Sequence, residues 1–297
     1  MKFVHKTIAL MLIGGMTGLW SCRYLQSEKE DKAQSAATET TASKTAAAAP
    51  SKELKFTTFS ESRKGHIDND AALPACTAEV SLVYPDGGYT GKLSLEQLQQ
   101  LFLKSLPEGM QSGATPSAAA RRFIENYIRE YQSEMSEYRK EARKKDNAWM
   151  NYETIVSSKS LYNKHDFWGY SVEVYQYTGG AHGISTTTYN VIDLESGRPL
   201  SLQDLFAESD YAVINRMLRQ QLADDTGTSV DKLDSDYDVD NIVVNDSFML
   251  GSDAVTWLYN PYDIAPYSFG TIRIALPYRA IAGYLKTNSP LRRVLPE

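Results

Sequence analysis

Alternation of apolar and polar residues is the clearest pattern in the sequence. Over residues 78–84 the even positions are Ala78, Val80, Leu82 and Tyr84, and the odd positions are mostly polar. A period of two is typical of a strand that buries one face. The same period, or a short apolar run between turn residues, predicts further strands at 55–60, 150–160, 168–177, 184–194, 248–250, 254–259 and 270–276.

A period of three to four residues replaces the alternation after residue 115. Thr115 suits a helix N-cap and Pro116 suits a first turn, and neither Gly nor Pro follows before residue 145. The pattern predicts one long helix near 116–145, about 45 Å in length. Its apolar stripe consists of Phe123, Tyr127, Tyr131, Met135, Tyr138 and Ala142.

The end of this predicted helix is basic, with five Lys or Arg and one Glu over residues 139–145. Positive charge suits the C-terminal end of a helix dipole, and we take this as the explanation. The alternative is a patch that contacts an anionic surface.

Shorter helices complete the predicted fold. Ser94 followed by Gln97 forms a capping-box pattern and predicts a helix over 94–104. Because strands and helices are segregated along the chain, we expect an α+β fold with antiparallel sheets packed with helices, in two small, intimately associated domains. The other helices are expected at 202–206, 210–223 and 277–285.

The N-terminus predicts an exported lipoprotein. A basic start precedes apolar residues 7–20, a run shorter than the roughly 20 residues that span a membrane. The run ends in Leu19-Trp20-Ser21-Cys22, which resembles the bacterial lipobox. We expect a signal peptide over 1–21, lipidation of Cys22 and anchoring to the outer membrane, facing the periplasm or the surface. An ordinary secretory signal is the alternative.

Residues 22–51 predict a flexible tether. After Tyr24 and Leu25 this stretch has no large apolar side chain, so it cannot bury enough surface to offset its ordering entropy. The acidic group at 27–31 resembles the surface-export signal of some Bacteroidetes lipoproteins. Simple solubility is the alternative explanation.

Charge and cysteine content limit the class of protein. The 297 residues carry 31 Lys and Arg against 37 Asp and Glu, so the net charge is −6 and no basic footprint for nucleic acid is present. Two cysteines cannot build a disulfide framework. With Cys22 lipidated, Cys76 has no partner, and we expect it to be buried as a small hydrophobe.

A linked series of motifs runs from residue 177 to residue 270. It comprises Tyr177-Thr178-Gly179-Gly180-Ala181-His182-Gly183, Asn190-Val191-Ile192-Asp193-Leu194, Gly197-Arg198-Pro199-Leu200, Leu202-Gln203-Asp204-Leu205-Phe206, Asn260-Pro261-Tyr262-Asp263-Ile264-Ala265-Pro266-Tyr267 and Gly270. In this order the series resembles the C-terminal domain of the anti-sigma factor RsiV. Residues 80–86, with the long helix, resemble a PdaC-type domain. The expected domains are therefore 52–164, PdaC-like, and 165–297, RsiV-like.

The RsiV resemblance implies a lysozyme-binding ectodomain. In RsiV, lysozyme binding releases a sigma factor, but this sequence shows no cytoplasmic segment before the export signal, so we expect only the ectodomain function. PdaC is a peptidoglycan deacetylase through a separate catalytic domain that we do not find in this sequence. We therefore expect a non-enzymatic protein whose partners are a lysozyme-like protein or peptidoglycan-derived glycan, with the membrane contacted through the N-terminal lipid.

The glycine-rich loop after strand 168–177 is the candidate ligand site. Three glycines in seven residues permit close approach of a partner, and aromatic rings beside them are favoured at interfaces or against sugars. His182 is expected to fix the loop by hydrogen bonding, or to contact the partner. The candidate ligand-binding residues are Tyr175, Tyr177, Gly179, Gly180 and His182, and Trp168 is a further ring that a sugar could use.

The sequence contains no pattern for a metal, a cofactor or catalysis: HExxH, paired cysteines, GxSxG and the P-loop are absent. Two alternatives stay open. One is a cell-wall glycan enzyme that uses His182 with Asp193 or Glu173, and the other is a structural envelope protein without a soluble ligand.

Residues 224–246 concentrate the negative charge, with eight Asp and one Lys. The alternate aspartates at 234–240 suggest calcium, but an EF-hand would need Gly and Glu where Val239 and Asn245 stand. We expect a solvated acidic loop. The alternative is a surface that steers a cationic partner such as lysozyme.

Overall fold

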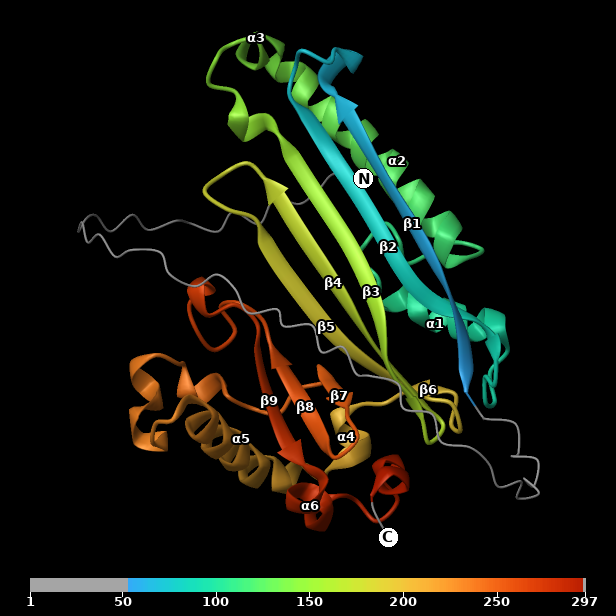
Figure 1. Ribbon diagram of the computed structural model, residues 1–297, viewed down its shortest axis with the longest axis vertical. Helices are drawn as coiled ribbons and strands as arrows, with labels where there is room; N and C mark the ends of the chain where they lie inside the picture. Colours follow the sequence, from blue (N-terminus) through green and yellow to red (C-terminus); the bar gives the residue numbers. More distant parts are fainter. Residues whose placement is uncertain (1–52, 296–297) are drawn as a thin grey trace, which may run out of the picture. The chain divides into compact units, whose positions relative to one another are not determined.

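Six strands form the larger sheet of the computed structural model, which describes residues 53–295 (Figure 1). The predicted signal peptide, Cys22 and the tether lie outside these residues. The strands expected from alternation between residues 55 and 194 are confirmed, most of them with longer bounds. In order across the sheet they are β1 (Leu54–His66), β2 (Ala75–Gly88), β3 (Tyr152–Lys164), β4 (Phe167–Thr178), β5 (Ile184–Asp193) and β6 (Arg198–Pro199).

One strand pair differs from the expected antiparallel arrangement. β2 pairs with β3 in parallel, with Cys76 opposite Tyr152 and Ser81 opposite Ser157. The chain between these strands holds the helices α1 (Leu95–Ser105) and α2 (Pro116–Met135), and such a crossover returns the chain in the same direction. The expected domain boundary between residues 164 and 165 falls between β3 and β4, inside this sheet.

α1 and α2 cover one face of the sheet (Figure 1). The capping box of α1 is present as predicted, because the Ser94 hydroxyl accepts from the Gln97 backbone N–H and the Gln97 side chain accepts from the Ser94 N–H. Under the helices, the ring of Phe102 packs against Trp168 and Tyr170, with centroids 5.8 and 5.3 Å away. The buried face of β2 is the even-numbered one, as the alternation predicts.

The predicted helix over 116–145 is too long. α2 begins at Thr115 and Pro116 as expected but ends at Met135, and a short 3-10 turn leads into α3 (Arg139–Ala142). Beyond Met135, tertiary contacts replace the helical continuation. Tyr138 meets Trp149 edge to face, and Arg139 binds the carboxylate of Asp68. No helix among residues 53–295 is long and apolar enough to cross a bilayer.

A second, three-stranded antiparallel sheet lies against β4 and β5, and its strands and helices match the expected positions to within a few residues. Its core continues into the larger sheet, because Phe167 and Val191 are buried in the same cluster as Phe248 and Trp257. The elements of this layer are α4 (Leu202–Leu205), α5 (Tyr211–Thr226), β7 (Phe248–Leu250), β8 (Ala254–Tyr259), β9 (Ile272–Pro277) and α6 (Tyr278–Ile281). The described chain is therefore a mixed α+β structure, as expected.

The C-terminal end is tied to the larger sheet. Arg293 Nη2 lies 2.5 Å from the carboxylate of Asp193, which is 3% exposed, and its guanidinium stacks over the ring of Phe167. The buried residues of the three hydrophobic clusters all lie between Leu54 and Val294, and the described residues 53–295 belong to one compact unit. A chain that begins at residue 49 therefore keeps every core contact and is expected to fold on its own.

Burial predicts that the Cys76 thiol is inert in the folded protein. Cys76 is free and buried, as expected, and burial raises its pKa from 9.0 to about 11. In a chain that begins at residue 49, where it is the single cysteine, a disulfide reagent at pH 8 should label Cys76 at the rate of unfolding. Rapid labelling without denaturant would contradict the burial.

The raised pKa of Cys76 belongs to the folded state alone, so the unfolded chain loses its thiol proton first. The free energy of unfolding should therefore decrease as the pH rises above 9.

Candidate functional site

The β4–β5 loop is built so that its backbone approaches a neighbouring segment. Gly179 has a φ of +82°, and a Cβ there would overlap the carbonyl oxygen of Trp149. The Tyr177 hydroxyl donates to the Gly180 carbonyl at 3.1 Å, which closes the turn. A side chain at position 179 would therefore separate the loop from Trp149.

Aromatic rings hold the second half of the loop. The ring of Tyr175 lies where a Cβ of residue 183 would be, so Gly183 permits this contact. The His182 ring stacks on Tyr267 with centroids 4.1 Å apart, and His182 Nδ1–H donates to the Gly183 carbonyl at 3.0 Å. The Tyr267 hydroxyl donates to the same carbonyl at 3.0 Å. His182 thus has the expected role of fixing the loop.

Asn260 joins the second layer to the edge of β5. Its side-chain amide accepts from the Thr187 N–H at 2.7 Å and donates to the Thr187 carbonyl at 3.0 Å. This pairing imitates the next strand of a sheet. It brings the segment 260–267 beside the β4–β5 loop, although the two lie about 80 residues apart in the sequence.

Segment 260–267 exposes a further ring. Tyr262 is 60% exposed, has a φ of +74°, and lies 5.9 Å from the Tyr267 ring. A positive φ is rare for a large side chain, and here hydrogen bonds from Tyr262 N–H to Ala265 and from Asn260 N–H to the Asp263 carboxylate hold the turn. The turn therefore presents Tyr262 to solvent beside the stacked His182 and Tyr267.

The acidic segment 224–246 adjoins these rings. The Asp238 N–H donates to the Ile264 carbonyl at 2.8 Å, and Tyr237 meets Phe269 edge to face at 5.4 Å. All eight aspartates of the segment are exposed. We define the candidate site as the loop 177–183, the segment 260–267 and the acidic segment 224–246, which form one chain of contacts.

The predicted site residues fall into this site in different ways. Tyr175, Tyr177, Gly179, Gly180 and His182 all belong to the β4–β5 loop or the strand end that carries it. Trp168 does not, because it is fully buried under α1 and α2, and no sugar can stack on it.

The sequence reasoning missed a group of contributors outside the loop. For Asn260, Tyr262 and Tyr267 the signal was present, because segment 260–267 belongs to the same motif series as the loop. What the sequence did not show was that the two segments touch. The missed residues are Trp149, Asn260, Tyr262, Tyr267 and Phe269.

The structure does not bring together the residues of the alternative catalytic pair. Asp193 lies at the opposite end of β5 from His182, roughly 36 Å along the extended chain, where Arg293 binds it. Glu173 pairs across from Thr187, five residues beyond His182, or roughly 16 Å along the strand. Among residues 53–295 no group of three acidic, His or Cys side chains could hold a metal ion.

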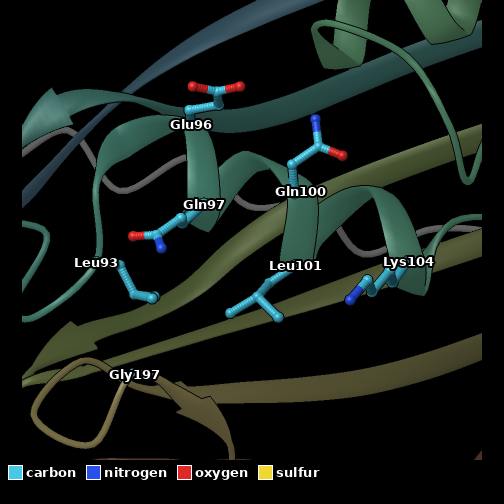
Figure 2. Close-up of a pocket in the computed structure, with 7 residues that line it drawn as sticks. All are labelled: Leu93, Glu96, Gln97, Gln100, Leu101, Lys104 and Gly197. Atoms are coloured by element: carbon cyan, nitrogen blue, oxygen red, sulfur yellow. The ribbon is translucent and has the colours of Figure 1, made fainter.

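A shallow groove of about 320 Å³ lies elsewhere, between α1 and the turn at Gly197 (Figure 2). Leu93 and Leu101 line it toward that turn, with Glu96 and Lys104 on its rim. Its two glutamines already have partners, since Gln97 binds the Ser94 N–H and Gln100 binds the Gly113 carbonyl. The groove therefore offers little specific recognition, and it lies at the other end of β5 from His182.

Comparison with known proteins places this arrangement in a family. Residues 24–185, more than half of the chain, match the family described as "Deacetylase PdaC". The chain belongs to the PdaC family. Residues 203–279 match a second family, described as "Protein of unknown function (DUF3298)". The β4–β5 loop thus lies in the PdaC match, and segment 260–267 lies in the DUF3298 match.

Two solved structures share the fold of this PdaC-family chain. A DUF3298 family member from Bacteroides fragilis is 27% identical, with a TM-score of 0.75, over 83% of this chain and 99% of that chain. A DUF3298 family protein from Pseudomonas aeruginosa PAO1 is 18% identical, with a TM-score of 0.54, over 82% of this chain and 97% of that chain. No curated protein matches the chain.

The amide of Asn260 provides a test of how the candidate site is held together. Asn260→Ala removes both hydrogen bonds to Thr187 and should lower the free energy of unfolding by about 1–3 kcal/mol. Hydrogen exchange of the Thr187 amide should accelerate by more than that of the amides in β2. Asn190→Ala, which removes a half-buried amide on the same strand that does not contact the second layer through a hydrogen bond, is the matched control. Unchanged exchange at Thr187 would show that the two hydrogen bonds of Asn260 do not hold the site together.

Proposed function

We propose that this protein is a non-enzymatic lipoprotein of the cell envelope that binds a cationic protein of the lysozyme type through the candidate site. The observation that carries the proposal is that the exposed rings of Tyr262 and Phe269 lie on a stretch of chain that contacts the dense acidic segment 224–246 directly. Exposed tyrosines supply rigid contact area at an interface, and an acidic border favours a cationic partner.

The charge of the acidic segment is large enough to matter. Its net charge of −7 exceeds that of the whole chain, −6, so the remainder of the protein is close to neutral. Such a local field raises the association rate of an oppositely charged partner and is screened by salt, with a Debye length of about 10 Å at 0.1 M and about 3 Å at 1 M. Hen lysozyme is a suitable cationic probe.

A protein partner suits the rings better than a glycan does. His182 and Tyr267 stack on each other, so each has one ring face already covered. A sugar needs an open ring face, whereas a protein interface can use the edges and the exposed Tyr262. Peptidoglycan-derived glycan is the second ligand to test, because Tyr262 still offers an open ring.

The proposed localisation comes from the N-terminal sequence. The short apolar run before Cys22 supports export and lipidation at that residue, and the composition of 22–51 supports a tether. A tether would let the folded region meet a protein that enters the envelope.

Calorimetric titration with hen lysozyme tests the proposal. We expect micromolar or tighter binding at 0.1 M salt that weakens strongly at 1 M. Replacing Asp234, Asp236, Asp238 and Asp240 by Asn should weaken binding at low salt by about tenfold or more, about 1.4 kcal/mol over the four charges. Replacing the exposed Glu96, Glu108, Glu130 and Glu137 by Gln is the matched control, with the same change in net charge and little expected effect.

Other results would point elsewhere. Heat with soluble peptidoglycan fragments and none with lysozyme would replace the protein ligand by a glycan. Turnover of peptidoglycan that is lost in folded His182→Ala would make the protein an enzyme. No heat with either ligand would exclude both and leave a structural envelope protein.

A further inference from the structure

The basic residues after α2 are not explained by the helix dipole. α2 ends at Met135, and its last turn contains no basic residue. The cationic cluster instead lies in α3, a helix of four residues, and in the turn that follows. Dipole effects are confined to the last turn of a helix, so the charge of residues 139–146, +3 in total, needs another explanation.

Part of this cluster is used within the fold and part is free. Arg139 binds both carboxylate oxygens of Asp68, at 2.6 and 2.8 Å, and this contact lowers the pKa of Asp68. Lys144 lies 3.8 Å from Glu141. Lys140, Arg143 and Lys145 are exposed and form no ion pair within residues 53–295. The charge of Arg143 adds a weaker effect to that of Arg139 in lowering the pKa of Asp68.

Two exposed aromatic side chains border the free cations. Tyr138 and Trp149 are each 42% exposed, and their rings meet edge to face with centroids 5.9 Å apart. Amphipathic rings of this kind beside Lys and Arg are favoured at the boundary between a bilayer and water. The neighbouring Met150 is buried, which fixes the position of Trp149 on the surface.

We propose that Tyr138, Lys140, Arg143, Lys145 and Trp149 form a docking patch for a membrane surface rich in anionic lipids. The cations match the lipid phosphates, and the two rings enter the headgroup region. A soluble anion would use the charges but not the rings, and it would favour buried, convergent donors rather than exposed, spread ones. The proposal rests neither on the lysozyme-type partner nor on a lipid on Cys22. Trp149 meets the candidate site through its backbone carbonyl, whereas its ring belongs to the patch.

Vesicle binding by residues 49–297 tests the patch. This chain omits apolar residues 7–20, which would bind vesicles by themselves, and it keeps every core contact. Of its three Trp residues, Trp168 and Trp257 are fully buried, so a change in fluorescence reports on Trp149. Vesicles that contain phosphatidylglycerol should pellet the protein at low salt and shift its emission to the blue, and phosphatidylcholine vesicles should do neither.

Charge reversal of the free cations is the decisive variant. Lys140→Glu with Arg143→Glu and Lys145→Glu should weaken binding by about 100-fold or more, since each basic residue near an anionic surface contributes roughly a factor of five. Lys55→Glu with Lys159→Glu and Lys164→Glu is the matched control, with the same change in net charge at exposed positions of β1 and β3. Trp149→Phe should abolish the blue shift while leaving the protein folded.

Three results would overturn the proposal. One is the absence of pelleting with phosphatidylglycerol vesicles, and another is an equal loss of binding in the two charge-reversed proteins. The third is an equal blue shift with soluble polyphosphate, which would assign the patch to a soluble anion. Circular dichroism of each variant confirms that lost binding does not reflect unfolding.

Discussion

Double-sided burial of β4 is the constraint on which both layers depend. Phe167 and Trp168 are consecutive residues, yet Phe167 points into the core with the three-stranded sheet and Trp168 into the core with α1 and α2. Both are fully buried. The two cores therefore share one strand, and neither layer can move without disturbing the other. Toward its C-terminal end β4 loses this cover on one face, and there Tyr175 and Tyr177 become available to the candidate site.

Local chemistry determined most of the elements, and distant contacts determined the exceptions. The capping box at Ser94 and the Thr-Pro start of α2 could be predicted because each involves neighbouring residues. The end of α2 at Met135 could not be predicted, because the chain beyond it is held by the contact between Arg139 and Asp68, 71 positions away. The parallel pairing of β2 and β3 could not be predicted either, since a half-buried strand has the same period of two in a parallel and in an antiparallel pair.

The candidate site could be located from the sequence but not assembled. The glycines and His182 identified the loop, yet its contact with Asn260 and Tyr267 depends on how the second layer lies against β5. His182 and Asp193 are close in the sequence but far apart in the structure, because they lie at opposite ends of the extended strand β5. In the assembled structure the loop has opposite charges on its two flanks, the acidic segment beyond Ile264 and the basic turn before Trp149.

The tie between Arg293 and Asp193 has a consequence for the order of folding. A chain that emerges N-terminus first, from a ribosome or during export, presents the whole larger sheet by residue 199, but the segment that covers the far side of Phe167 ends near residue 294. The second layer therefore becomes available only after the larger sheet. Until then a strand with large apolar side chains on both faces has cover for one face alone. The nascent chain is then most exposed to aggregation, and a chaperone that shields aromatic surface would act at this stage.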